Sequence, residues 1–498
     1  MTIVDLLQAG RSESPAILSP GLEALSYGDL RAVVERLAGQ LCSLGISRND
    51  RVAMVLPNCP GMAVTFLAVA SCASAVPLNS KYREREFRFY LKDLGVRALI
   101  THQGDLEEAR VATPDGSLQL TLEGSGADLR FRHGEAVPAQ AEPEYAEPDD
   151  CALVLHTSGT TARPKIVPLT HHNLTASAGN IVRSLALTES DRCLNVMPLF
   201  HIHGLIAGLL APLSVGGAVA CTPEFDVFKF FEWMDELRPT WYTAVPTMHN
   251  LISARARRHT KVIERTPLRF LRSSSASLPP AVMEELERIF KAPMIEAYGM
   301  TEASHQMASN PLPPAGRKPG SVGKGTNVEI GIMDSNGRML LHGERGEVVI
   351  KGKNVVAGYE NNPDANAKAF IDGWFRTGDE GYIDEDGYLF LTSRLKEIIN
   401  RGGEKISPRE VDEALLGLPE IAEAVAFALP HEKLGEDVAV AIVLAEGASV
   451  TERDVRQFAA DRLAYYKVPR KVVIVDAIPK GPTGKVQRVS LAQQLGLT

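Results

Sequence analysis

The chain has 498 residues, of which 45% are hydrophobic and 23% are charged, and its formal net charge is −8. This length predicts at least two domains, and the composition is that of a globular protein rather than a disordered or fibrous one. Because nucleic acid is bound by clustered lysine and arginine, an acidic chain without a basic stripe is not expected to bind it.

The start of the chain does not resemble a targeting segment. Met1 to Leu18 contains acids and lacks the basic start and apolar run of a signal peptide, and nowhere do about 18 apolar residues follow one another. We therefore expect a cytoplasmic protein without a membrane partner. The six cysteines form no C-x-x-C pair, which favours reduced thiols over a disulfide framework or a zinc site. They are Cys42, Cys59, Cys72, Cys151, Cys193 and Cys221.

Strand-like and helix-like segments alternate in the first part of the chain, which is typical of an α/β domain. A short apolar run from Asp50 to Leu56 precedes a helix-like stretch that continues to Ala75. The segment from Gly116 to Asp149 is richer in glycine, proline and acids, and we interpret it as a variable surface excursion. Another strand-like run, Cys151 to Leu155, follows.

The last hundred or so residues have a different pattern, which predicts a small α+β domain. Two strand-like runs, Ala422 to Leu429 and Val438 to Leu444, precede a helix that begins after Thr451 and a further strand-like run from Lys471 to Val475. Thr451 and Asp454 have the spacing of a capping box at the start of that helix. We place the domain boundary at residues 394–397, between a large domain of residues 1–393 and a small one of residues 398–498.

The segment after His156 combines hydroxyls, a glycine and one lysine, which are the groups that bind a polyphosphate. It reads TSGTTARPK from Thr157 to Lys165. A Ser/Thr-rich hairpin is the alternative on composition alone. A P-loop ATPase is disfavoured, because the sequence contains no G-x-x-x-x-G-K-[ST]. The predicted phosphate ligands are Thr157, Ser158, Gly159, Thr160, Thr161 and Lys165.

This loop resembles T-S-G-[ST]-T-G-x-P-K, the signature of the adenylate-forming superfamily of acyl-CoA synthetases, nonribosomal adenylation domains and firefly-type luciferases. Two positions depart from the pattern, since Ala162 and Ile166 stand where the family has or often has glycine. The resemblance extends in order from about Ser26 to Arg488. It implies an α/β fold with a large N-terminal AMP-binding domain of layered α/β subdomains and a small, mobile α+β C-terminal domain. It also implies an ATP-dependent acid–CoA ligase that uses Mg²⁺ and coenzyme A.

Three further segments resemble nucleotide motifs of the superfamily. Tyr298 to Glu302 matches Y-G-x-T-E, Trp374 to Asp379 matches W-x-x-T-G-D, and Ser393 to Glu397 resembles the segment with the interdomain hinge. By resemblance, Tyr298 stacks on adenine, Thr301 hydrogen-bonds the α-phosphate and Glu302 ligates Mg²⁺. Asp379 and Arg394 contact the ribose, and Lys396 is the hinge residue. Taken alone, Glu302 would be a solvated acid and Asp379 a turn residue.

Pro479 to Lys485 resembles the P-K-T-x-x-G-K motif that carries the adenylation lysine, so the predicted catalytic residues are Lys485, Glu302 and Thr301. A carboxylate must first be joined to AMP, because a thiol can then displace the AMP. The pyrophosphate that leaves in the first step requires positive charge held in place. The segment with Gly402 and Gly403 resembles G-G-x-K-I, whose glycines let backbone approach pantetheine after the C-terminal domain rotates. A hairpin turn is the other interpretation of this pair, and the two are compatible.

Four side chains are predicted to face the acid. Leu199 to Gly204 resembles F-H-x-x-G, which places His201 at the gate of the acyl pocket and His203 inside it. Ser275 and His305 border the nucleotide motif, where long-chain and aryl enzymes usually have apolar residues. The sequences WYTAVPT from Trp241, SASLPP from Ser275 and EAYGMTEASH from Glu296 most resemble the oxalate–CoA ligase group.

The resulting hypothesis is an acid–CoA ligase for a small dicarboxylate, namely oxalate. The alternative is a medium-chain or 4-coumarate-type ligase, which would need an apolar tunnel at His203 and His305. A module that loads a carrier protein is disfavoured because no carrier domain follows, and a luciferase-type oxidase on prior grounds. A non-catalytic nucleotide-binding regulator would be favoured by the loss of Lys485, Glu302 or Asp379, all of which are present. The oligomeric state is left open.

Overall fold

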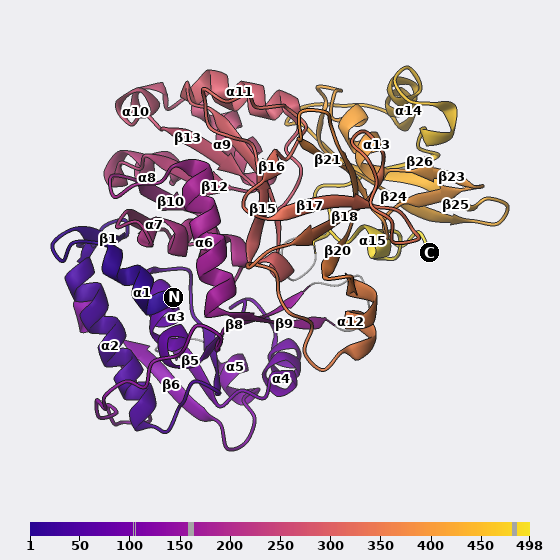
Figure 1. Ribbon diagram of the computed structural model, residues 1–498. Coiled ribbons are helices and arrows are strands. Elements are labelled where there is room, and N and C mark those ends of the chain that lie inside the picture. The colour runs from indigo at the N-terminus through magenta and orange to yellow at the C-terminus, as the bar shows by residue number, and fades with distance from the viewer. Residues whose placement is uncertain (103, 105, 158–163, 481–485) are drawn as a thin grey trace. The chain divides into compact units, whose positions relative to one another are not determined.

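The computed structural model of the protein describes residues 1–102, 104, 106–157, 164–480 and 486–498. These residues belong to two units. Figure 1 colours the chain by residue number, from indigo at the N-terminus to yellow at the C-terminus. Unit 1 contains Met1–Thr157, Pro164–Ile330 and Ile350–Gly373, and unit 2 contains Gly331–Val349 and the chain from Trp374 onwards. Residues 394–397 lie inside unit 2, so this division does not test the proposed hinge, which stays a prediction.

The first sheet of unit 1 has seven strands, and its central pairs are parallel. Its edge pairs, β6 with β7 and β8 with β9, are antiparallel. The spatial order is β7 (Arg130–Arg132), β6 (Leu118–Glu123), β5 (Ala98–His102), β3 (Arg51–Val55), β4 (Ser74–Pro77), β8 (Cys151–Thr157) and β9 (Lys165–Thr170). The predicted β-strand and helix at residues 50–75 are β3 and α3 (Pro60–Cys72), but part of the predicted surface excursion forms β6 and β7.

The second sheet of unit 1 has nine strands, with parallel pairing from β1 to β14 across its centre. The order is β16 (Lys324–Gly325), β15 (His305–Ser309), β14 (Met294–Met300), β13 (Phe270–Ser273), β12 (Trp241–Ala244), β10 (Arg192–Asn195), β11 (Ala218–Cys221), β1 (Pro15–Leu18) and β2 (Leu25–Ser26). Parallel strands in the middle of a sheet are covered on both faces, which explains why every residue of β11, β12 and β13 is buried.

Helices of unit 1 cover these sheets, as Figure 1 shows. One core is formed where Leu194, Tyr242 and Leu271 of the nine-stranded sheet pack against α8, α9 and α11. Residues next along the strands point to the opposite face, because side chains alternate along a strand. The helices are α1 (Ile3–Leu6), α2 (Tyr27–Ser43), α3, α4 (Glu84–Asp93), α5 (Glu107–Val111), α6 (His171–Leu185), α7 (Ala211–Leu213), α8 (Phe230–Leu237), α9 (Pro246–Ala256), α10 (Thr260–Arg265), α11 (Pro280–Phe290) and α12 (Pro363–Ala369).

Unit 2 contains two further sheets. The strands β17 (Glu329–Met333), β18 (Gly346–Lys351), β20 (Trp374–Ile383) and β21 (Leu389–Arg394) belong to one of them. The other has the order β23 (Glu404–Ile406), β22 (Ile399–Arg401), β25 (Gly435–Leu444) and β24 (Ile421–His431), with β26 (Lys471–Ile474) on β25. One face of this second sheet packs on α13 (Pro408–Leu415) and α14 (Glu452–Ala460), and the other on α15 (Arg488–Gln494).

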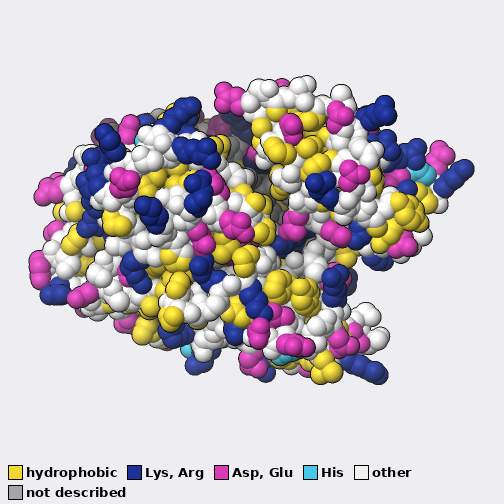
Figure 2. All heavy atoms as spheres, turned by 90° about the horizontal axis from the view of Figure 1, so that it is seen from above, with side chains coloured by type: hydrophobic (Ala, Val, Ile, Leu, Met, Phe, Trp, Pro, Cys, Tyr) yellow, Lys and Arg dark blue, Asp and Glu magenta, His cyan; other side chains and the backbone are white. Residues whose placement is uncertain are grey.

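The structure confirms the α/β prediction and the main elements of the C-terminal part. The predicted strands correspond to β24, β25 and β26, and Thr451 caps α14, where its Oγ1 accepts a hydrogen bond from Asp454 N at 3.2 Å. All six cysteines are free thiols. Within the described ranges, no helix combines the length and the apolar character that crossing a bilayer requires. On the face drawn in Figure 2, basic and acidic side chains are interspersed.

Candidate active site

The segment from Tyr298 to Glu302 joins the end of strand β14 to the 3₁₀ turn Thr301–Ala303. Gly299 lies against the neighbouring strand so closely that a Cβ atom there would be 1.9 Å from the carbonyl oxygen of His305. Only glycine fits at this position. Tyr298 and Glu302 are buried, and Thr301 is half-buried. The glycine thus brings the predicted adenine and phosphate residues next to β15, on which His305 lies.

Glu302 is held by contacts that the sequence did not predict. Tyr359 Oη donates a hydrogen bond to Glu302 Oε1 at 2.8 Å, and Val356 N donates to the Glu302 carbonyl at 2.7 Å. The backbone of Tyr359 is fixed in turn by the amide of Asn366, which accepts from Tyr359 N and donates to Tyr359 O. Burial and the adjacent Glu302 carboxylate raise the pKa of Tyr359. The phenol therefore stays protonated and acts as a donor to the carboxylate.

The two ends of the predicted phosphate loop face each other across an antiparallel pair. Thr157 ends β8, Lys165 begins β9, and the two residues are register partners. Lys165 Nζ lies 4.0 Å from the centroid of the Tyr359 ring, within the range of a cation–π contact. Tyr359 thus contacts both Lys165 and Glu302, which are far apart in sequence. Ser158, Gly159, Thr160 and Thr161 lie outside the described residues, and so does Lys485.

The predicted ribose ligands are in unit 2, on two paired strands. Asp379 on β20 and Arg394 at the end of β21 are register partners, and Arg394 Nε donates to Asp379 Oδ1 at 2.9 Å. The carboxylate is buried, whereas about half of the Arg394 side chain is exposed. Lys396 is exposed in the turn that follows β21. Gly402 and Gly403, with φ of 61° and 100°, form the two-residue turn between β22 and β23, as the hairpin interpretation predicted.

Three of the four residues predicted to face the acid form one cluster in unit 1. His203 Nδ1 and Ser275 Oγ are 3.0 Å apart, and the rings of His203 and His305 stack with centroids 4.7 Å apart. His201, two residues before His203 in the chain, is half-buried, and its Nδ1 accepts a hydrogen bond from His203 N at 3.3 Å. His203 begins the buried π-helix η3 (His203–Leu210). Ser275 and His305 have φ of 73° and 95°, and such strained backbone is characteristic of functional sites.

The centre of this cluster is Arg272, a residue that no sequence motif indicated. Arg272 lies on β13 opposite Thr243 of β12, on the sheet face that points away from α8, α9 and α11. It is fully buried, and each terminal nitrogen has two partners. Nη1 lies 3.0 Å from His203 Nε2 and 3.1 Å from Thr243 Oγ1, and Nη2 lies 3.0 Å from both His305 Nε2 and Gln306 Oε1.

The charges in this cluster follow from its burial. Burial lowers the pKa of Arg272 to about 9, which still leaves the guanidinium charged at neutral pH. Burial, together with His305 and Arg272, lowers the pKa of His203 well below its usual range. His203 is therefore neutral at pH 7. No carboxylate of the described chain lies within 4 Å of the Arg272 guanidinium. The cluster has one positive charge surrounded by neutral groups.

Comparison with known proteins agrees with the sequence motifs. Residues 8–360 match the AMP-binding enzyme family, and residues 410–485 match the AMP-binding enzyme C-terminal domain. The chain belongs to the family of AMP-binding enzymes. These matches support a large N-terminal and a small C-terminal domain.

Several relatives of this AMP-binding enzyme are named as CoA ligases. "Probable CoA ligase CCL9" of Humulus lupulus is 47% identical over 99% of this chain and 96% of its own length. "Oxalate–CoA ligase" of Arabidopsis thaliana is 46% identical over 94% and 93%, and that of Saccharomyces cerevisiae is 40% identical over 97% and 95%. The solved structure of ATP-bound MatB from Rhodopseudomonas palustris has a TM-score of 0.90, with 28% identity, and covers 100% of this chain and 99% of that one. The protein is an AMP-forming acid–CoA ligase.

The AMP-binding enzyme has one predicted magnesium ligand, Glu302, and its surroundings fit such a role. Mg²⁺ that accompanies a nucleotide needs only one or two protein carboxylates, because phosphates and water complete its coordination. Among the described residues, no three His, Cys, Asp or Glu side chains gather into a site that could hold a metal without such help. The Tyr359 hydrogen bond orients the Glu302 carboxylate. The arrangement is compatible with an ion that arrives with ATP.

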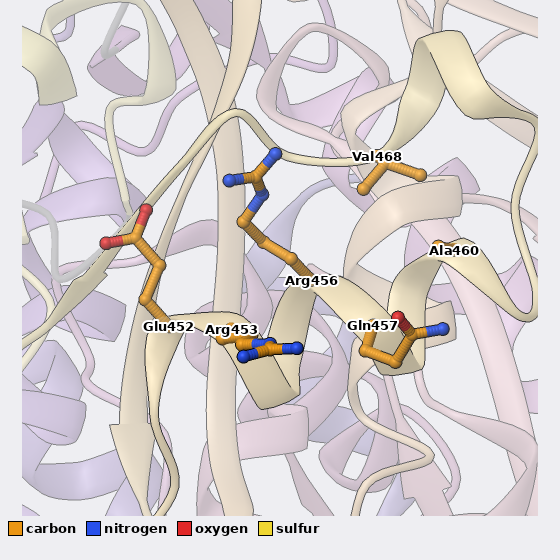
Figure 3. A pocket seen from close by; sticks show the side chains of 6 residues that line it. All are labelled: Glu452, Arg453, Arg456, Gln457, Ala460 and Val468. Atoms are coloured by element: carbon orange, nitrogen blue, oxygen red, sulfur yellow. The ribbon is translucent and has the colours of Figure 1, made fainter.

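Unit 2 of the AMP-binding enzyme also has a hollow on α14, shown in Figure 3. Arg453, Arg456 and Gln457 in its lining are exposed. It contains none of the residues predicted to bind nucleotide or acid. We therefore assign it no role. Its lining residues are Glu452, Arg453, Arg456, Gln457, Ala460 and Val468.

Proposed function

We propose that the protein is an ATP-dependent oxalate–CoA ligase, which joins oxalate to AMP and then transfers the oxalyl group to coenzyme A. The observation that carries the choice of acid is the polar cluster of His203, Ser275 and His305, in which His203 contacts both of the others and both histidines are buried. Both carboxylates of oxalate are ionised near neutral pH, so a pocket for it must offer hydrogen-bond donors in place of apolar walls. The oxalate–CoA ligases among the relatives support the same acid.

The distal carboxylate of oxalate would bind at this cluster while the proximal carboxylate attacks the α-phosphate of ATP. A charge-assisted hydrogen bond contributes roughly 1.5–3 kcal/mol, so two of them would favour oxalate strongly over acetate. A fatty acid would instead place its apolar chain against these polar groups. Sites built on polar contacts reject analogues that lack the matching group by up to about 10⁴-fold. His201 would guard the entrance to this pocket.

In the proposed first half-reaction, Lys485 and Lys165 hold positive charge near the phosphates, where negative charge moves onto the departing pyrophosphate. Thr301 hydrogen-bonds the α-phosphate, Tyr298 stacks on adenine, and Asp379 with Arg394 holds the ribose. Mg²⁺ bound at Glu302 would neutralise phosphate charge. These contacts position the acid and the phosphate for direct attack.

In the proposed second half-reaction, the thiol of coenzyme A attacks the acyl carbonyl and AMP leaves. The six free cysteines are not required, because the attacking thiol comes from the substrate. Rotation about Lys396 would withdraw Lys485 and bring Gly402 and Gly403 to the pantetheine. Neither glycine has a side chain that would obstruct this approach, and their positive φ values favour glycine at both positions.

The substrate assignment is tested by measuring acid-dependent AMP release with ATP and coenzyme A for oxalate, malonate, acetate, hexanoate and 4-coumarate. We expect the highest kcat/KM for oxalate. Higher turnover of hexanoate or 4-coumarate would favour the medium-chain or coumarate-type alternative. That outcome would remove the assignment of the acid but leave the ligase activity in place.

A further inference from the structure

Arg272 fixes the direction of the hydrogen bonds in the acid cluster. A guanidinium has five N–H donors and no acceptor, so every atom that it contacts must accept. Its four terminal N–H groups meet the Nε2 atoms of His203 and His305, the hydroxyl of Thr243 and the carbonyl of the Gln306 side chain. Because Arg272 only donates, the oxygen of the Gln306 amide must face it, and the amide nitrogen lies 2.9 Å from Ser184 Oγ.

The tautomer of His203 follows from these contacts. Its Nε2 accepts from Arg272 Nη1 and lies 2.6 Å from Thr243 Oγ1. Because Nε2 accepts, the single hydrogen of the neutral imidazole is on Nδ1. That hydrogen points to Ser275 Oγ at 3.0 Å. Ser275 Oγ therefore accepts from His203, and its own hydroxyl hydrogen is directed to another acceptor.

His305 is in the same state for the same reason. Arg272 Nη2 donates to His305 Nε2 at 3.0 Å, so the hydrogen of the neutral His305 ring is on Nδ1. Arg272 and His203 are fully buried and His305 is nearly so, whereas Ser275 is half-buried. The chain of donors thus begins at a buried permanent charge and ends at a hydroxyl on the more open side.

We propose that Arg272 is a positioning residue for acid specificity, which holds His203 and His305 as Nδ1–H tautomers so that Ser275 donates its hydrogen to the distal carboxylate of the acid. This inference rests on the proposed function. It adds that the buried guanidinium is the charge that selects a dicarboxylate. A buried cation without an anionic partner is unfavourable, and a second carboxylate on the substrate supplies the missing negative charge. A monocarboxylate cannot supply this charge, because its only carboxylate becomes joined to the phosphate of AMP.

The first test needs no substitution in Arg272. The enzyme is labelled with ¹⁵N in the imidazole rings of its 12 histidines, and the ring tautomers are read by NMR at neutral pH. His203→Gln and His305→Gln identify the two signals by their loss. We expect both rings to carry hydrogen on Nδ1. A hydrogen on Nε2 of either ring would overturn the proposal, because Arg272 could not then donate to that atom.

The second test compares Arg272→Lys and Arg272→Met with Arg257→Met, which removes an exposed arginine of the same unit. In Arg272→Met, the ratio of kcat/KM for oxalate to kcat/KM for acetate should fall about 100-fold, because a buried charge-assisted contact is lost. Arg272→Lys keeps the charge but not the two-pronged geometry, so it should restore part of the ratio. Arg257→Met should leave the ratio unchanged. Circular dichroism of each variant verifies the fold.

Ser275→Ala completes the set, because it removes only the final donor. We expect KM for oxalate to rise about 10- to 100-fold, with little change for acetate. An unchanged oxalate-to-acetate ratio in folded Arg272→Met or in Ser275→Ala would overturn the proposal. If the unmodified enzyme prefers oxalate but these variants keep the preference, the inference fails and the proposed function stands. If the unmodified enzyme does not prefer oxalate, the proposed function itself fails.

Discussion

The phenol of Tyr359 donates to the carboxylate of Glu302, and the same ring lies beneath the ammonium of Lys165. One side chain therefore positions an acidic and a basic residue that are separated by more than a hundred residues in sequence. Both were predicted to act on the phosphates of ATP. Because Tyr359 contacts these two residues, its removal should affect phosphate chemistry.

Tyr359→Phe should slow adenylate formation about 10- to 100-fold and raise the Mg²⁺ concentration needed for half-maximal rate. The ring beneath Lys165 is kept, but the carboxylate loses a hydrogen bond of the charge-assisted kind, worth about 1.5–3 kcal/mol. ATP–pyrophosphate exchange at varied Mg²⁺ measures both effects. Tyr465→Phe, at a tyrosine that is 84% exposed, is the matched control. An unchanged Mg²⁺ dependence would show that Tyr359 does not position a metal ligand.

Lys485→Ala should abolish adenylate formation while leaving thioester formation from supplied acyl-adenylate largely intact. Removal of one preorganised charge donor typically costs about 10²- to 10³-fold in rate. Pyrophosphate exchange measures the first half-reaction, and AMP release from acyl-adenylate and coenzyme A measures the second. Lys480→Ala, five residues earlier, is the control, since its ammonium lies 3.9 Å from Glu423 and has no predicted role in the reaction. Equal loss in both half-reactions would contradict the proposed domain alternation.

Lys396→Pro should spare adenylate formation and impair thioester formation, because proline fixes φ at the residue about which the domain is proposed to rotate. Lys396 is exposed in a turn, so loss of its side chain alone should matter little. Lys396→Ala is therefore the control, with both half-reactions expected to continue. Selective loss of adenylate formation in the proline variant would refute the hinge assignment.

Asp379→Asn should raise KM for ATP about 10- to 100-fold and remove the preference for ATP over 3′-deoxy-ATP. The carboxylate, paired with Arg394, is an ionised acceptor suited to a ribose diol. Steady-state kinetics with both nucleotides measures the preference. Glu385→Gln, an exposed acid in the same unit, is the control. A variant that still discriminates between the two nucleotides would require another ribose ligand.

Acid should destabilise the protein partly through His249. His249 is fully buried between Tyr242 Oη and the Arg272 carbonyl, each 3.1 Å away, and burial lowers its pKa to about 4. Between pH 6.5 and 4 the unfolded chain holds a proton on this ring that the folded chain lacks. The free energy of unfolding therefore falls as pH is lowered, by about 2 kcal/mol between pH 7 and pH 5 from this residue.

Denaturant unfolding at pH 7 and pH 5 measures that loss. His249→Gln keeps a donor and an acceptor but cannot titrate, so its loss over the same pH range should be smaller by the contribution of His249. His171, whose burial also lowers its pKa to about 4, continues to contribute in both proteins. Identical pH dependence in the variant and the unmodified protein would show that His249 does not cause the effect.

Local sequence predicted the strands and helices best where a pattern was strong, as in the capped helix after Thr451 and the strands around it. It did not predict β6 and β7 within residues 116–149, where glycine, proline and acids suggested a variable surface excursion. There β6 joins a neighbouring strand through backbone hydrogen bonds, which composition does not reveal. The formation of a strand depends on its partners more than on its own propensity.

The site was predictable where residues carry a motif and unpredictable where they only support one. Tyr298, Glu302, Asp379 and Arg394 were predicted from their order in the chain, and their roles stay predictions. Tyr359 and Arg272 were not, because their roles come from tertiary contacts with distant segments. Arg272 follows two apolar residues in the fully buried strand Phe270–Ser273, and a charged residue at such a position has to have buried partners. The partners themselves required the fold.

The π-helix His203–Leu210 also has a meaning for how this pocket could change during evolution. A π-turn contains about one residue more than an α-turn, and every residue of this helix is buried. Deletion of a single residue after His203 would allow an α-helix and turn the flanking side chains relative to each other by about 100°. The loss of one codon could therefore turn the imidazole of His203 away from Ser275 and turn aliphatic neighbours of His203 toward it. A polar acid pocket could therefore evolve into an apolar one without replacement of each polar residue in turn.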